Sequence, residues 1–128
     1  MPESANVLVD SSVWIDYFNG EKESVETLNS LIRSGRVVVC GMIMQEVLQG
    51  SRDEKAFAKL KKQMSLWEPV AEEPADFVEA ARIFARLRWK GMTIPPTDCL
   101  IAAVAIRLNL LFYARDGDFD HIAQLRHF

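Results

Sequence analysis

The sequence predicts an α/β protein, a three-layer sandwich in which helices cover a small, mostly parallel central sheet. Short apolar runs alternate along the chain with longer segments whose apolar residues recur at helical spacing. Strands of a parallel sheet are covered on both faces, so continuous apolar runs of this kind are typical of them. A chain of 128 residues has the length of one domain, and we expect residues 1–128 to form a single domain.

The N-terminal third predicts a strand, two helices and a second strand. Val7–Val9 is an apolar run that leads through Asp10 into a helix, which Asn19-Gly20 ends. Helical spacing then predicts a second helix that ends at Ser34-Gly35, followed by a second buried strand at Val37–Cys40.

The remainder predicts further helices, a third strand and a final helical turn. The helices are expected over residues 43–48, 53–67, 75–90 and 99–108, with an extended segment around Val70. Thr97 is the expected N-cap of the last of these helices, and Asn109 is its stop. Leu110–Tyr113 is the third buried strand, and residues 116–118 form a turn into a last short helix, with Asp118 as the expected N-cap.

Charge and cysteine content argue against several classes of protein. Fifteen Lys and Arg against eighteen Asp and Glu leave a net charge of −3, so we do not expect binding to duplex nucleic acid through bulk positive charge. Cys40 and Cys99 stand alone in apolar stretches, which favours reduced core thiols in a reducing compartment. No signal peptide or membrane span is recognisable, so we expect a soluble, cytoplasmic protein without membrane contact.

Four acidic residues fall near the ends of the predicted strands. Asp10 follows the first strand, Glu46 lies on the helix after the second, Asp98 opens the helix before the third, and Asp116 follows the third. Ligands of open α/β sheets bind beyond the carboxyl ends of the strands, so these side chains are expected to converge. Each acid taken alone is also typical of a cap, a turn or a solvated helix position.

The surroundings of these acids favour a divalent cation. Asp10 and Asp98 are flanked by apolar sequence, where an unpaired carboxylate is costly to bury. Arg115, beside Asp116, is the one basic residue close in sequence to any of the four acids. Oxygen ligands without His or Cys match Mg²⁺ or Mn²⁺, and such ions activate water in phosphoryl-transfer chemistry.

Motifs of other chemistries are absent. The sequence contains no phosphate-binding loop, dinucleotide fingerprint, nucleophile elbow or zinc-protease motif, which excludes nucleotide hydrolysis of the P-loop kind. His121 and His127 do not stand in a recognisable ligand pattern, and we interpret both as structural or solvated.

Four motifs resemble those of PIN-domain ribonucleases, and most of all the VapC-type toxins of prokaryotic toxin–antitoxin pairs. The motifs are Val-Leu-Val-Asp10-Ser-Ser12-Val-Trp-Ile-Asp, Gln-Glu46-Val-Leu-Gln-Gly, Pro-Thr97-Asp98-Cys-Leu-Ile-Ala-Ala and Asp116-Gly-Asp118-Phe-Asp-His-Ile. They occur in the family's order with suitable spacing and span the chain from Val7 to about Ile122.

The resemblance implies a parallel sheet between helices and endonucleolytic cleavage of RNA that depends on Mg²⁺, for which Mn²⁺ substitutes. The implied catalytic and metal-binding residues are Asp10, Glu46, Asp98 and Asp116, with Asp118 as a further candidate ligand and Ser12 and Thr97 as supporting hydroxyls. Cations held by these acids would lower the pKa of bound water and neutralise developing charge, so no covalent nucleophile is needed. Ala114 stands where the family usually has Thr or Ser, so one nearby hydroxyl is missing.

The resemblance also implies partners. These are an RNA substrate, a cognate antitoxin whose C-terminal segment blocks the acidic pocket, and a second copy of the chain in a homodimer. Operator DNA would be bound only through the complex with the antitoxin. Trp14, Phe18, Phe57 and Trp67 are interpreted either as core residues or as part of the antitoxin groove or a homodimer face.

Two basic stripes at helical spacing are candidates for contact with the RNA backbone. The first consists of Lys55, Lys59 and Lys62, and the second of Arg82, Arg86 and Lys90. Such stripes are also typical of a solvated helix face.

Two other functions remain open. A receiver-type signalling domain also has an acidic Mg²⁺ pocket at the strand ends, but Asp10 is followed here by serines, and Asp116 is preceded by Arg115 where a late Lys would be needed. A protein that keeps the PIN-like fold without catalysis and only binds a partner is the second alternative.

Overall fold

The computed structural model describes residues 5–128, and these form an α/β fold. Its elements in chain order are β1 (Val7–Val9), α1 (Ser11–Phe18), α2 (Lys22–Arg33), β2 (Val37–Val38), α3 (Gly41–Gln49), α4 (Glu54–Met64), α5 (Pro74–Trp89), α6 (Pro96–Arg107), β3 (Leu111–Tyr113), the 3₁₀ helix η2 (Gly117–His121) and β4 (Arg126–His127). The predicted fold class is therefore confirmed, and most predicted elements agree with the structure to within a few residues.

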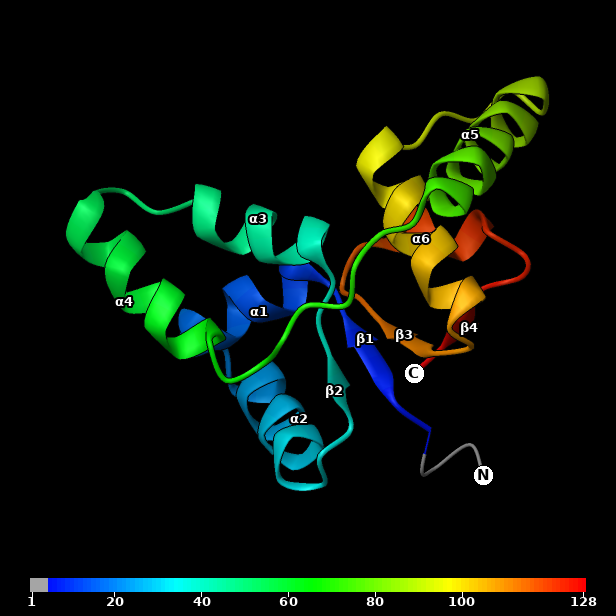
Figure 1. The fold of residues 1–128 in the computed structure, drawn as a ribbon. Coiled ribbons are helices and arrows are strands. Elements are labelled where there is room, and N and C mark those ends of the chain that lie inside the picture. Colours follow the sequence, from blue (N-terminus) through cyan, green and yellow to red (C-terminus); the bar gives the residue numbers. More distant parts are fainter. Residues whose placement is uncertain (1–4) are drawn as a thin grey trace.

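The sheet is parallel throughout, with the strand order β2-β1-β3-β4. The chain leaves β1 for β2 on one side and later returns to β3 on the other side of β1 (Figure 1). In such doubly wound sheets the crevice at the reversal of strand order is the usual place for a ligand. The carboxyl ends of β1 and β3 therefore border the expected site.

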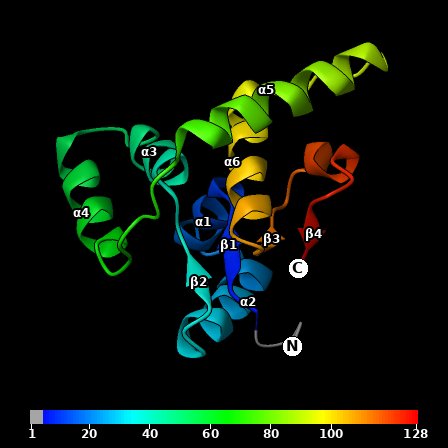
Figure 2. The same ribbon diagram turned by 45° about the vertical axis from the view of Figure 1, so that its right-hand side comes forward.

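Helices cover both faces of this sheet. Figure 2 shows α6 in front of the sheet and α1 behind it, while α3 and α4 extend away from β3 and β4. The three residues of β1 have no solvent-exposed surface, and most of the segment 101–105 in α6 is buried as well. This explains why both segments read as continuous apolar runs in the sequence.

Of the four aromatic residues with two interpretations, one is a core residue and the others lie nearer the surface. Trp14 is fully buried, and its ring centroid lies 4.9 Å from that of Trp67. Phe18 and Trp67 are half-buried and pack against the core. Phe57 on α4 is 36% exposed. The core interpretation is thus confirmed for Trp14, and Phe57 contributes to the surface.

The boundaries of α6 differ from the prediction at one end. Pro95 is the N-cap and Pro96 the first helical residue, so Thr97 as N-cap was wrong. Proline suits the first helical position because its missing N–H would have no partner there. At the other end Asn109 has φ 55°, and the N–H groups of Asn109 and Leu110 donate to the carbonyls of Ile106 and Ala105. This is a Schellman ending, so Asn109 as the stop is confirmed.

Two differences concern the edges of the sheet. Val37–Cys40 was predicted as one strand, but β2 ends at Val38 and Cys40 instead forms an isolated parallel bridge with Val70. The edge strand β4 was not predicted. Within residues 5–128 no helix is long and apolar enough to cross a membrane.

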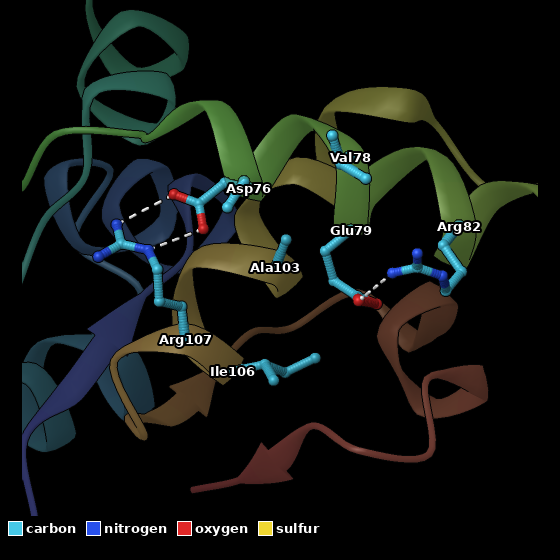
Figure 3. Close-up of a pocket in the computed structure, with 8 residues that line it drawn as sticks. Asp76, Val78, Glu79, Arg82, Ala103, Ile106 and Arg107 are labelled. Atoms are coloured by element: carbon cyan, nitrogen blue, oxygen red, sulfur yellow. Dashed lines mark hydrogen bonds and ion pairs between the residues drawn. The ribbon is translucent and has the colours of Figure 1, made fainter.

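A buried ion pair fixes α5 against α6. Asp76, which is 2% exposed, accepts hydrogen bonds from Arg107 Nε at 2.8 Å and Nη2 at 3.0 Å (Figure 3). Its Oδ2 also accepts from the backbone N–H of Glu73, which completes a capping box at the start of α5. The ends of the two long helices are thereby held together.

Candidate metal centre

The site lies where β1 and β3 end side by side. The backbone N–H of Asp10 donates to the carbonyl of Tyr113 at 2.8 Å, so the two chains leave the sheet together. Asp10 begins α1 as its N-cap, and Asp116 begins η2 as its N-cap. Both acids are therefore fixed by helix starts that directly follow the strands.

Three carboxylates form the centre of the site. Asp98 from the first turn of α6 and Asp116 and Asp118 from the start of η2 each offer an oxygen, and these oxygens all lie within 4.8 Å of one another. Asp98 and Asp118 are half-buried, and Asp116 is exposed. Residues 98 and 116–118 are thus brought together by the junctions on either side of β3.

Asp10 lies beside this group in the floor of the site. It is 4% exposed, and its Oδ2 accepts from Ser12 Oγ at 2.7 Å and from the Ser12 backbone N–H at 3.2 Å. Burial raises the pKa of Asp10, the hydrogen bonds from Ser12 and from the Ser11 backbone oppose this rise, and the charge of Asp116 adds to it. Ser12, expected to support the site, thus holds the Asp10 side chain.

Glu46 approaches from α3. Its Oε1 accepts a hydrogen bond from Ser11 Oγ at 3.1 Å, although the two residues are 35 positions apart in sequence. Burial raises the pKa of Glu46, the Ser11 hydroxyl lowers it, and the charge of Asp10 raises it again. Glu46 therefore lies next to Asp10, on the side of the site formed by α1 and α3.

The charges of four other carboxylates act on Asp98. Burial and the surrounding negative charges together raise the pKa of Asp98 to about 7. Burial has the largest effect, and the charges of Asp10, Asp116, Glu46 and Asp118 follow in that order. Both burial and nearby like charges disfavour the ionised form of a carboxyl group, and at Asp98 the two effects act in the same direction. All the predicted acids are therefore electrostatically coupled in the folded chain.

No basic side chain within residues 5–128 neutralises this charge. Among the described residues, none of the five acids forms an ion pair with Lys, Arg or His. Arg115 turns away: its Nη1 donates to Glu21 Oε1 at 2.8 Å, and its Nε lies 3.5 Å from Asp16 Oδ2. The Arg115 backbone N–H donates to Ser12 Oγ at 3.2 Å, which ties the loop before Asp116 to α1.

The donor set fits a hard divalent cation. Every candidate ligand atom is a carboxylate oxygen, and the oxygens of Asp98, Asp116 and Asp118 are close enough to share one ion. A bound cation would offset the repulsion that raises the pKa of Asp98. Zn²⁺ sites normally include His or Cys, and neither His121 nor His127 belongs to this group. The residues present therefore suit Mg²⁺ or Mn²⁺.

The structure corrects the roles at the start of η2. Asp118 as N-cap was wrong, because Asp116 is the N-cap and its Oδ1 accepts from the Asp118 backbone N–H at 2.9 Å. The Asp118 side chain therefore does not cap η2, and it belongs to the acidic group. Thr97 lines an apolar pocket with Phe77 and Phe84, and within residues 5–128 its hydroxyl makes no hydrogen bond with the acids.

One supporting residue was missed. Ser11 orients Glu46, yet only Ser12 had been singled out in the Asp10-Ser11-Ser12 segment. A signal was available, because successive residues at a helix start point in different directions, so two serines there can serve two different acids.

Comparisons with known proteins find similar sequences. Residues 7–125 match the PIN domain family. Ribonuclease VapC11 of Mycobacterium tuberculosis is 35% identical over 124 residues, which cover 93% of this chain and 92% of the relative. Ribonuclease VapC1 of Methanocaldococcus jannaschii is 28% identical over 126 residues, covering 98% of this chain and 85% of the relative.

Solved structures share the fold. The structure of VapBC2 from Rickettsia felis bound to a DNA fragment from its promoter contains a chain with a TM-score of 0.81 and 19% identity, and the match covers 95% of this chain and 96% of that one. At this identity the likeness shows that the fold is common to both.

Proposed function

This chain belongs to the PIN domain family, and we propose that it is a Mg²⁺- or Mn²⁺-dependent endoribonuclease that acts as the toxin of a toxin–antitoxin pair. The observation that carries the proposal is the group of uncompensated carboxylates at the ends of β1 and β3. A relative with 35% identity over nearly the whole chain is named a ribonuclease, which supports RNA as the substrate.

The five acids form two groups in the proposed mechanism. Asp98, Asp116 and Asp118 would hold the cation, while Asp10 and Glu46 complete the negative site from the side of α1 and α3. A divalent cation, when bound, lowers the pKa of water and offsets the charge of the scissile phosphate.

The serines keep the acids in place. Ser12 Oγ fixes Asp10 and, by accepting from the Arg115 N–H, joins α1 to the loop that carries Asp116. Ser11 fixes Glu46. Rigidly placed side chains of this kind retain their geometry during the reaction, which is what metal-assisted hydrolysis requires of the protein.

We further propose an antitoxin as protein partner. The structural relatives include complexes of VapB with VapC, some of them bound to DNA, which supports a partner that in turn carries operator DNA. In this chain a small pocket lined by Tyr17, Phe18, Leu66 and Trp67 offers an apolar surface near α1 and α4, and Leu66 is 78% exposed. An Arg from the partner would complement the acidic site.

A homodimer is the second assembly that we propose. The long helix α5 exposes Phe77, Val78 and Trp89, which are 57%, 60% and 77% exposed. Large apolar side chains in this number on one helix are typical of a protein contact surface. Light scattering of the purified protein tests the dimer, and Val78→Asp is expected to shift it towards the monomer.

The central experiment measures cleavage of a mixed RNA pool by the purified protein. We expect fragments with Mg²⁺, none with Mg²⁺ and excess EDTA, and none with Asp98→Asn under either condition. Undiminished cleavage in EDTA would exclude the metal mechanism. If neither protein cleaves under any condition but a partner is bound, the chain is a binding protein with the PIN fold.

Growth of a bacterial host tests the toxin assignment separately. Expression of the chain alone is expected to slow growth, and expression of Asp98→Asn is not. Growth that is unaffected by the active protein, with no partner co-purifying, would contradict the role as a toxin even if RNA is cleaved in the test tube.

A further inference from the structure

A basic pocket lies between α5 and the segment that follows the acidic group. Its cavity has a volume of about 170 Å³ and is lined by Ile83, Arg86, Leu87 and Lys90 of α5 together with His121 and Ile122. In Figure 2 the segment after β3 passes beneath the C-terminal half of α5. Arg86 and Lys90, one turn apart at the end of α5, and His121, which stands 31 positions after Lys90, therefore surround one hollow.

Within residues 5–128 the basic side chains of this pocket have no acidic partner. Among the described residues, Arg86, Lys90 and His121 form no ion pair or side-chain hydrogen bond, and no Asp or Glu lines the cavity. Other arginines form ion pairs: Arg82 pairs with Glu79, and Arg107 pairs with Asp76. In a chain with a net charge of −3, the two unpaired cations Arg86 and Lys90, which converge with His121 on one hollow, indicate an anionic ligand.

The pocket and the proposed metal centre each take a residue from the 3₁₀ helix η2. His121 ends η2, and Asp118 of the acidic group stands three residues earlier in the same 3₁₀ helix. A 3₁₀ helix has three residues per turn and rises about 2 Å per residue, so Asp118 and His121 lie on the same side about 6 Å apart along the axis. That step is comparable to the separation of successive phosphates along an extended nucleic-acid strand.

We propose that Arg86, Lys90 and His121 form a subsite for an RNA phosphate next to the one that is cleaved. The proposal rests on the proposed ribonuclease function and specifies how that function holds its substrate. Arg86 and Lys90 supply positive charge, and the imidazole of His121 supplies an N–H donor and a flat face on which a base can stack. The apolar floor of Ile83, Leu87 and Ile122 suits the sugar or the base attached to that phosphate.

Arg88 offers a matched control on the same helix. It is exposed, carries the same charge and shares the C-terminal end of α5, where any cation interacts favourably with the helix dipole. Two positions along a helix correspond to a rotation of about 200°, so Arg88 faces away from the side that carries Arg86 and Lys90. It does not line the cavity.

The test measures binding separately from cleavage. A fluorescent single-stranded RNA is titrated into protein that carries Asp98→Asn, alone and combined with Arg86→Ala, Lys90→Ala, His121→Ala or Arg88→Ala. We expect each of the first three changes to raise the Kd about two- to fivefold, and the change at Arg88 to leave it nearly unaltered. The slope of log K against log salt is expected to fall by about 0.7 when the phosphate contact is lost.

A second readout uses the Asp98-containing protein, with melting curves as the check on folding. Arg86→Ala and Lys90→Ala are expected to raise KM for RNA while kcat stays the same, because they act on a part of the substrate away from the reacting bond. Equal weakening by Arg88→Ala and Arg86→Ala, or unchanged RNA binding in all the variants, would overturn the subsite. If the protein binds RNA in this pattern but never cleaves it, the subsite stands and the proposed nuclease function fails.

Discussion

The carboxylate of Glu72 occupies the space that a side chain at Gly41 would need. Its Oε2 accepts from the Met42 backbone N–H at 2.7 Å, and a Cβ built on Gly41 would lie 2.7 Å from its Oε1. Cys40, the N-cap of α3, provides no side-chain cap of its own, so Glu72 performs that task from a distance of about 30 residues. Because α3 carries Glu46, this contact also fixes one wall of the metal centre.

The first prediction is that Gly41→Ala and Glu72→Ala are coupled. Alanine at residue 41 would displace the flexible Glu72 carboxylate, so that α3 loses its cap at a cost of about 1 kcal/mol. This loss would offset the gain in helix propensity from Gly to Ala, which is at most about 1 kcal/mol. In a Glu72→Ala background the space is free, so Gly41→Ala should be more favourable there by about 1 kcal/mol. Urea denaturation of the four proteins measures this coupling.

Gly50→Ala serves as the control for that cycle. Gly50 lies at the other end of α3 and has a negative φ. A Cβ added there would lie 3.9 Å from its nearest neighbour, the backbone oxygen of Val47. Its effect on stability is expected to be the same with Glu72 or Ala at residue 72. Additive behaviour of Gly41→Ala and Glu72→Ala would contradict the close contact.

The second prediction concerns pH. The pKa of Asp98 is about 7 in the folded chain and near 3.8 when unfolded, so the folded state binds this proton more tightly. The free energy of unfolding of the metal-free protein should therefore decrease as the pH rises from about 4 to about 7. Asp98→Asn is expected to reduce that slope, which urea denaturation at several pH values in EDTA measures.

Metal binding should show the opposite dependence on pH. A cation must displace the proton from Asp98, so the rise in melting temperature caused by Mn²⁺ is expected to be larger at pH 8 than at pH 6. A rise of equal size at both pH values, or none at all, would argue against cation binding at this carboxylate.

The central strands and the convergence of the acids could be predicted from the sequence, and the reason is physical. Val7–Val9 and the residues around Phe112 are buried on both faces, and burial forces an apolar composition that can be read directly. Acids placed after such strands must come together in a parallel sheet, whatever the details of the loops. Asp10 and Asp98 belong to the four acids selected at strand ends and helix starts, and the charges around Asp98 show that they do meet.

Features that depend on distant partners could not be predicted. Arg126 and His127 are exposed and polar, and they form β4 only because β3 offers a free edge. The link from Glu72 to Met42 spans 30 residues and has no local signal. The start of η2 was placed two residues late, because Asp116 and Asp118 are equally suitable caps and only the three-dimensional path selects between them.

The third prediction separates the two tasks of Asp116, which caps η2 and belongs to the acidic group. Asn is as good an N-cap as Asp, so Asp116→Asn should retain stability but weaken Mn²⁺ binding. Asp116→Ala should weaken binding similarly and also cost about 1 kcal/mol of stability. Mn²⁺ titration and urea denaturation of both variants measure these effects.

Asp118→Asn completes this comparison. Its side chain does not cap η2, so we expect unchanged or slightly higher stability of the metal-free protein and a loss of Mn²⁺ affinity comparable to that of Asp116→Asn. Full Mn²⁺ affinity in Asp118→Asn would remove this residue from the metal centre.

The fourth prediction concerns the ion pair between Asp76 and Arg107. Burial alone would raise the pKa of Asp76, but the hydrogen bonds and charge of Arg107 and the Glu73 N–H lower it below its ordinary value. Arg107→Met would leave a buried carboxylate without its cation, and because Arg107 is 26% exposed we expect a loss of about 2 kcal/mol, below the range for fully buried pairs. Asp76→Asn in the same protein should recover part of this loss, since the amide oxygen still accepts from Glu73.

The pH dependence of this pair has the opposite sign to that of Asp98. A carboxyl group with a lowered pKa in the folded state stabilises the fold above its unfolded pKa, and that contribution disappears as the pH falls through the lower, folded value. The stability difference between the parent and Arg107→Met should therefore be full at pH 7 and shrink below about pH 4. A difference that stays constant from pH 7 to pH 3 in urea denaturation would mean that Arg107 contributes through the packing of its alkyl chain and not through its charge.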